Sequence, residues 1–383
     1  MEDNALLIAL LTNATAGKHL PEGLERLSVE QFERIYKTAR RHDVAQLVFY
    51  ALKQNGLLPE EENSVNALKH FYACLSRVAR LTAETKNIDE ALKNADIKHI
   101  MLKGTVIRNL YPSDWMRTSG DIDCLVPEEE LDRAVSIFAG IGYGQENEKE
   151  YHDIPLAKQD IRVELHFNIC ENRPPLDKVL KRVWDYATPV DESTFAETPE
   201  FFMFHHLAHM AYHLTGGGCG VRNLLDTQMI RTHLEYDEAV VRDLCEEAGI
   251  TRFYDLLIQL CDVWYANAPH TSETECLEQF MLSAGAFGIS EFTQSATGLM
   301  TDVRRENLRE YIFFPYEKLK ELYPIVGKHK FLTPLYEVRR WINKLSQKGD
   351  RVLLKNVLLK QKTAEGTEMR HIMETTGLMH LIG

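Results

Sequence analysis

Apolar residues recur every three or four positions through the first part of the chain, which is the spacing of one face of an α-helix. Ser28 stands at the start of the first such run and Gln31 lies three positions later, a pattern typical of a helix N-cap. A second run, from about Ser64 to Ala95, keeps the same period over a longer stretch. We therefore predict an N-terminal helical region over residues 1–95.

The pattern changes at Ile97, where short apolar runs bounded by Gly or Pro replace the helical period. In the third of these runs polar and apolar residues alternate, so Glu164 and His166 share one face of a half-buried strand. The order of elements predicts a small mixed sheet with helices packed on one face. The expected strands span residues 97–102, 121–126 and 161–169, and the expected helices span residues 106–110 and 128–140.

The remainder of the chain returns to helical spacing. Residues 187–199 look like the exit from the sheet-containing region, and apolar helices are expected over residues 201–214, 224–234 and 253–265. The sequence thus predicts an α+β fold, with a central domain over residues 96–190 between the N-terminal helices and a C-terminal helical domain over residues 191–383.

Composition limits the class of protein. Of 383 residues, 44% are hydrophobic and 26% are charged, which is typical of a soluble globular protein of two or three domains. No apolar run approaches the length of a membrane span, so a cytoplasmic protein is expected. The seven cysteines are scattered without a CxxC pair, which favours reduced core thiols over a zinc site.

The formal charge of −13 opposes wholesale binding to nucleic acid, because such binding depends on neutralising phosphates. The stretch from Arg339 to Lys362 could form a local basic surface, because Lys and Arg outnumber Asp there and alternate with apolar residues. An amphipathic helix packed on its own protein is the simpler interpretation of that stretch. We therefore do not expect the protein to bind nucleic acid, except through this segment.

Two carboxylates stand two positions apart on the second expected strand. Side chains alternate across a strand, so Asp121 and Asp123 project to the same face. Like charges held this close are costly as anions, and a divalent cation removes that cost. Mg²⁺ prefers a few carboxylates together with substrate phosphates, and Mn²⁺ is the alternative ion. Glu164 on the adjacent strand would complete a metal site with Asp121 and Asp123.

The turn before this strand carries residue types suited to phosphate. Gly104 lets the main chain approach a ligand closely because it lacks Cβ. Thr105 adds a hydroxyl donor, and Lys103 and Arg117 supply positive charge for a triphosphate.

These residues resemble a family. The run from Leu102 to Thr105, the Tyr111-Pro112 pair and the run from Arg117 to Val126 are similar to an uncharacterised bacterial branch of the polymerase β-like nucleotidyltransferases. The segments 163–166 and 218–226 resemble further motifs of that family, so the likeness extends over roughly residues 30–340.

The resemblance implies a polymerase β-like domain that transfers a nucleoside monophosphate from an NTP, with ATP the expected donor, and releases pyrophosphate. The acceptor would be a hydroxyl of a small molecule or a protein. Asp121, Asp123 and Glu164 become the expected catalytic residues, with Glu164 a possible base. Nucleotide-binding candidates are Lys103, Gly104, Thr105, Arg117, Gly120, His166 and Arg222.

Other interpretations stay open. The family usually has Gly or Ser at the position of Thr105 and Asp at that of Glu164, so a nucleotide-binding regulator with weak or lost turnover is one alternative. An RNA-acting transferase using the basic C-terminal stretch is another. His205, His209 and His213, with Asp226, could form a phosphohydrolase metal site, but a polar helix face near the nucleotide is simpler. Two further features have simple structural interpretations. Residues Gly216–Gly220 are expected to connect two helices, and Arg222 and Asp226 are expected to form an ion pair four positions apart on one helix.

Overall fold

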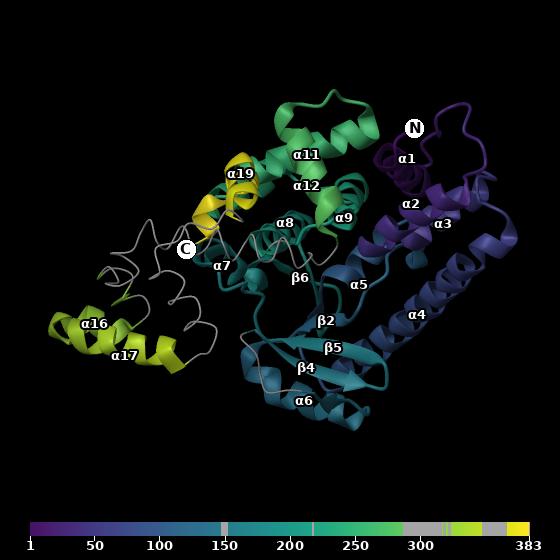
Figure 1. Ribbon diagram of the computed structural model, residues 1–383. Coiled ribbons are helices and arrows are strands. Elements are labelled where there is room, and N and C mark those ends of the chain that lie inside the picture. The colour runs from purple at the N-terminus through teal and green to yellow at the C-terminus, as the bar shows by residue number, and fades with distance from the viewer. Residues whose placement is uncertain are drawn as a thin grey trace.

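Helices surround a central sheet in the computed structural model, which describes residues 1–146, 152–216, 218–285, 316, 319–320, 323–346 and 366–382 (Figure 1). Within these residues the sheet has seven short strands of mixed direction. The fold is therefore of the α+β class, with much more helix than strand.

The N-terminal region consists of α1 (Asp3–Ala16), α2 (Val29–Arg41), α3 (Ala45–Gln54) and the long α4 (Glu61–Asn94). The cap at the start of α2 is confirmed, since the Ser28 hydroxyl accepts a hydrogen bond from the Gln31 amide at 3.2 Å. The chain turns between α2 and α3, where Asp43 adopts a positive φ of 54°. One apolar run thus yields two helices that pack against each other.

The sheet is built from strands that are distant in the chain. Its order is β3-β4-β5-β2-β1-β7-β6, with β2 parallel to β5 and β1 parallel to β7. Helices α5 and α6 connect the first strands, so the predicted alternation of strands and helices is confirmed. The bounds are β1 (His99–Met101), α5 (Lys103–Ile107), β2 (Ile122–Leu125), α6 (Leu131–Gly140), β3 (Gly144–Gln145), β4 (Asp153–Lys158), β5 (Ile161–His166), β6 (Ala187–Pro189) and β7 (Thr194–Glu197).

Residues 187–199 do not leave the sheet, so the expected exit there was wrong. This segment forms the β6–β7 hairpin, and β7 pairs with β1 through the Thr194 and His99 positions. The hairpin turn is closed locally, because the Asp191 carboxylate accepts hydrogen bonds from the Ser193 and Thr194 amides. Strands of three or four residues give too little alternation to be recognised in the sequence.

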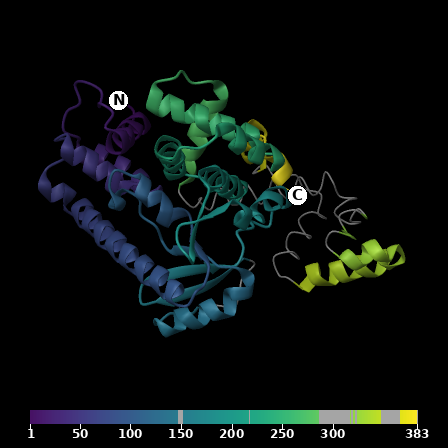
Figure 2. The same ribbon diagram turned by 180° about the vertical axis from the view of Figure 1, so that it is seen from behind.

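Both faces of the sheet are covered, which corrects the expectation of helices on one face only. Ile122 and Cys124 of β2 point into a core shared with α4 and α6. Leu125 points to the opposite face, into the core formed with the other helices. Figure 2 shows α4 and α6 alongside the sheet when the molecule is viewed from behind. Asp123 lies on the same face of β2 as Leu125, toward the C-terminal helices.

The helices before and after the sheet share one hydrophobic core. Leu10 of α1 and Val48 of α3 belong to the same buried cluster as Phe204 and Leu257. The expected division at residues 95 and 190 stays a prediction, and the helical regions before and after the sheet share this buried cluster. The later helices are α7 (Pro174–Leu180), α8 (Pro199–Thr215), α9 (Val221–His233), α10 (Glu238–Glu247), α11 (Thr251–Ala266), α12 (Ser272–Ala284), α16 (Pro324–Lys328), α17 (Thr333–Ser346) and α19 (Gly366–Thr376).

Three expectations from composition can be followed here. All seven cysteines are free thiols, and six of them are buried. Among the described residues, no helix is long and apolar enough to cross a bilayer. The possible nucleic-acid surface at 339–362 lies outside the described residues from 347 onward, so it stays a prediction.

Candidate functional site

A polar cavity of about 380 Å³ opens between the sheet and the helices α8 and α9. Its walls come from the turn after β1, the strands β2 and β5, and the facing surfaces of these two helices. The cavity brings together nine of the ten residues that the sequence predicted for the site, and the exception is Thr105. Its lining consists of Lys103, Gly104, Ile107, Arg117, Ser119, Gly120, Asp121, Asp123, His152, Glu164, His166, Glu171, His206, His209, Tyr212, His213, Arg222, Asn223 and Asp226.

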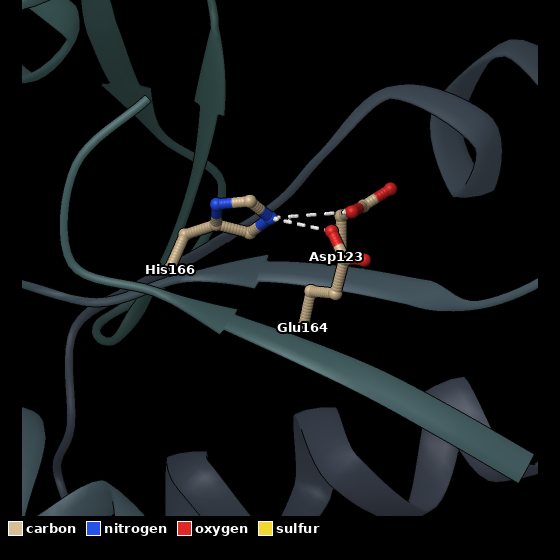
Figure 3. A group of neighbouring side chains, drawn as sticks. All are labelled: Asp123, Glu164 and His166. Atoms are coloured by element: carbon tan, nitrogen blue, oxygen red, sulfur yellow. Dashed lines mark hydrogen bonds and ion pairs between the residues drawn. The ribbon is translucent and has the colours of Figure 1, made fainter. Parts of the chain in front are cut away.

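Asp123 and Glu164 occupy paired positions on neighbouring strands. Because β2 and β5 run parallel with these two residues in register, their carboxylates project from the same face. His166, two positions along β5, joins them, and ligand atoms of the three residues lie within 4.8 Å of one another (Figure 3). Asp121 precedes β2 and lines the same cavity, although it is not part of this group.

The negative charges at this point are only partly compensated. Burial, together with the charges of Asp123 and Glu164, raises the pKa of Asp121 to about 7. Burial acts in the same direction on Asp123, but the hydrogen bond from His166 and the charge of Lys103 outweigh it and lower the pKa of Asp123. The site therefore favours an additional positive charge near Asp121.

His166 supplies part of that charge in the absence of a ligand. Its Nε2 lies 3.2 Å from the Asp123 carboxylate and 3.5 Å from that of Glu164. Burial would lower the pKa of His166, but these two hydrogen bonds raise it to about 9. The protonated imidazole donates to the paired carboxylates and holds them in place.

The donor set fits a hard divalent cation. It combines carboxylate oxygens from Asp123, Glu164 and the nearby Asp121, which suit Mg²⁺ or Mn²⁺ better than a thiolate-preferring metal, and the His166 imidazole could join them only after losing its proton. Asp121, whose ionised form is disfavoured without a counter-charge, is the side chain with most to gain from such an ion.

The expected phosphate-binding turn at residues 103–105, called the phosphate turn below, forms the start of α5 (Lys103–Ile107). This helix therefore begins three residues before the expected start at 106. Lys103 has a positive φ of 35°, which is uncommon for a residue with a side chain. A Cβ on Gly104 would lie 3.3 Å from the Cβ of Ser119, so this position tolerates little bulk. The Thr105 hydroxyl is buried and has no hydrogen-bond partner among the described residues, but Thr105 does not line the cavity.

Two arginines of the site are held by carboxylates from other elements. Arg117 donates to Asp226 at 2.9 Å, and Tyr111 donates to the same carboxylate at 2.8 Å. Arg222 forms an ion pair with Asp43. The expected Arg222–Asp226 pair on α9 was therefore wrong, because each residue has a partner from another element.

The loop before β2 is ordered by arginines that sequence reasoning missed. Arg77 of α4 donates to the carbonyls of Ser119 and Gly120 at 3.1 and 2.6 Å. Arg108 donates to the Ser119 hydroxyl at 2.6 Å and to the Arg117 carbonyl at 3.2 Å. These side chains fix the backbone that leads to Asp121, and nothing local in the sequence marks them.

The histidines of α8 divide between the core and the cavity. His205 is buried against Glu197 at 2.8 Å, and His206 contacts Thr227 and the Asn223 carbonyl while also lining the cavity. His209 and His213 line the cavity, as in the interpretation of a polar helix face near the nucleotide. Glu171, also missed from the sequence, contacts His209 at 2.7 Å.

Comparison with known proteins shows to which family the chain belongs. A family model described as an uncharacterised nucleotidyltransferase matches residues 28–266, which is more than half of the chain. The chain belongs to this nucleotidyltransferase family. Membership indicates a transferase of nucleoside monophosphates with an NTP as substrate. Neither a search of curated proteins nor a search of solved structures gives a match.

The matched range of the nucleotidyltransferase family includes every residue named at the cavity. It also includes the helices α2 to α4, with Arg77 of α4 that holds the loop before β2, and the helices α8 and α9 that line the cavity. The part of the chain that matches the family thus includes the sheet and also helices that precede and follow it in the sequence.

Proposed function

We propose that this chain transfers a nucleoside monophosphate from an NTP to a hydroxyl acceptor in a reaction that depends on Mg²⁺ or Mn²⁺. The observation that carries the proposal is the pairing of Asp123 and Glu164 on adjacent strands, with Asp121 beside them, in the cavity that contains the phosphate turn. We also propose a polymerase β-like fold for residues 96–190, ATP as donor, a small molecule or protein as acceptor, and a cytoplasmic location.

Asp121, Asp123 and Glu164 would hold the ion. Bound there, the cation would neutralise negative charge that develops on the α-phosphate and lower the pKa of an attacking hydroxyl. Asp123 and Glu164 come from paired strand positions, and Asp121 directly precedes β2, so their spacing is set before substrate arrives.

The phosphate turn would hold the rest of the triphosphate. The Lys103 ammonium would neutralise phosphate charge, whereas Thr105, which does not line the cavity, stays a nucleotide-binding candidate from the sequence alone. Gly104 keeps the backbone accessible next to Ser119. We keep Arg117, Gly120, His166 and Arg222 as nucleotide-binding candidates because all four line the cavity.

The test compares Asp121→Asn and Asp123→Asn with the exposed-carboxylate control Asp132→Asn on α6. Each α-labelled NTP is supplied with Mg²⁺ or Mn²⁺ and with small-molecule and protein extracts as acceptors, and pyrophosphate and labelled product are measured. We expect a loss of about 10²–10³-fold in the two site variants. Asp121→Asn should keep or raise the melting temperature, because the asparagine removes a disfavoured charge. No labelled product from the unaltered protein with any NTP would contradict the proposal.

A nucleotide-binding regulator is the second candidate. It is favoured by the position of His166, whose Nε2 contacts both Asp123 and Glu164 and so competes with a cation for these carboxylates. Binding of NTP without release of pyrophosphate would favour this candidate over the enzyme.

A further inference from the structure

A chain of hydrogen bonds leads from a buried carboxylate through two histidines into the cavity. Glu171 contacts Nδ1 of His209 at 2.7 Å, and Nε2 of His209 lies 2.9 Å from Nε2 of His213. The two rings meet edge to face, with an interplanar angle of 88°. The proposed metal ligands are not members of this chain, which lies on the α8 side of the same cavity.

The shorter of two contacts at Nδ1 of His209 favours one arrangement of the protons. The Glu171 carboxylate at 2.7 Å is a buried acceptor, whereas Lys103 Nζ at 3.2 Å is a donor that would need a lone pair on the same nitrogen. We therefore place the hydrogen of His209 on Nδ1, facing Glu171, and the lone pair on Nε2. Nε2 of His213 must then donate to His209, which leaves Nδ1 of His213 as the basic nitrogen. Among the described residues, no hydrogen bond is made to that Nδ1.

The surroundings keep the imidazoles of His209 and His213 neutral, so each ring retains a nitrogen with a lone pair. Burial lowers the pKa of His213, and Lys103 and Arg222 act in the same direction, while Glu171 opposes them. Burial, Lys103 and His213 likewise lower the pKa of His209. Lys103 Nζ stands 3.2 Å from Nδ1 of His209, and this ammonium disfavours a metal ion in the cluster.

We propose that His213 is the general base for the acceptor, with His209 and Glu171 as positioning residues. The inference rests on the nucleotidyl transfer proposed above. The O–H bond of the acceptor breaks and its proton goes to Nδ1 of His213, while the oxygen forms a bond to the α-phosphorus. The bond from that phosphorus to the bridging oxygen breaks, and pyrophosphate leaves with the electron pair. Glu171 stabilises the resulting imidazolium through His209.

The tautomers can be tested without substrate or metal. In ¹⁵N-detected imidazole spectra of the metal-free protein, with signals assigned from His209→Gln and His213→Gln, we expect hydrogen on Nδ1 of His209 and on Nε2 of His213. Glu171→Gln should weaken the preference for the His209 tautomer. The opposite tautomers, or an imidazolium at His213 at neutral pH, would overturn the relay whether or not the chain transfers nucleotides.

The base role is tested by chemical rescue. In the pyrophosphate-release assay, His213→Ala should lose about 10²–10⁴-fold in kcat with little change in KM for the NTP, and added imidazole should restore turnover. His213→Gln should also lose the rise of kcat with pH below about 6.5 that a histidine base gives. The exposed His233→Gln on α9 is the matched control.

The outcomes separate the two proposals. Turnover that survives in His213→Ala, or a loss that imidazole and pH leave unchanged, overturns the base role while leaving nucleotidyl transfer intact. Circular dichroism and melting of both His213 variants show whether a loss reflects unfolding. Absence of turnover in the unaltered protein overturns the transferase itself.

Discussion

Removal of Asp226 should expose how strongly the fold depends on one buried ion pair. The side chains of Arg117 and Asp226 are 9% and 1% exposed, and the pair joins the loop before β2 to α9. Burial opposes the charge on Arg117, yet the Asp226 carboxylate holds the pKa of this guanidinium above its ordinary value. In Asp226→Ala the guanidinium and the Tyr111 hydroxyl would both lose their shared acceptor.

Loss of one partner from a buried pair costs about 3–5 kcal/mol, because the other charge stays out of water without compensation. The exposed pair between Arg242 and Asp255, with side chains 46% and 37% exposed, is the matched control. Asp255→Ala should change the free energy of unfolding far less than Asp226→Ala, since solvent screens the interaction.

Urea unfolding followed by circular dichroism measures both free energies. The double variant Arg117→Met/Asp226→Leu leaves neither charge in the core and should recover most of the loss caused by Asp226→Ala. A cost below about 1 kcal/mol for Asp226→Ala, or a double variant less stable than the single one, would refute the argument that an uncompensated buried charge dominates.

Two further predictions concern pH and backbone packing. Burial lowers the pKa of His42 to about 4, and its Nε2–H donates to the Leu282 carbonyl at 3.0 Å. The unfolded chain therefore binds the proton more readily, and stability should fall by up to about 3 kcal/mol as pH drops from about 6.5 to 4. His42→Gln keeps a donor and should show less of this acid sensitivity in unfolding experiments at several pH values. Gly104→Ala should weaken NTP binding in calorimetric titration, since its Cβ would press on Ser119, while Gly140→Ala has open space and should not. Equal acid sensitivity in His42→Gln, or equal NTP affinity in the glycine variants, would contradict these accounts.

The part of the site on the strands was predictable from local pattern. Alternation places Glu164 and His166 on one face of β5, and the spacing of Asp121 and Asp123 marks β2 as a candidate metal strand. Their convergence then depends only on β2 and β5 being neighbours, which the strand order provides.

The rest of the site depends on contacts between distant segments. Glu171 follows β5 without any motif, and its contact with His209 exists only because α8 packs over the sheet. Arg222 and Asp226 suggested a local pair by their spacing, but Asp43 and Arg117 reach them from other elements. A single sequence gives helical spacing and strand alternation, and neither encodes which helix faces which strand.

The central claim is that Asp121, Asp123 and Glu164 share a divalent cation at the α-phosphate. A crystal structure with a non-hydrolysable ATP analogue and Mn²⁺ tests it most directly, through anomalous scattering. The account predicts a manganese peak in contact with these carboxylates and with the phosphates, in the cavity beside Lys103 and Gly104. A peak elsewhere, or a nucleotide bound with no metal at these residues, would contradict it.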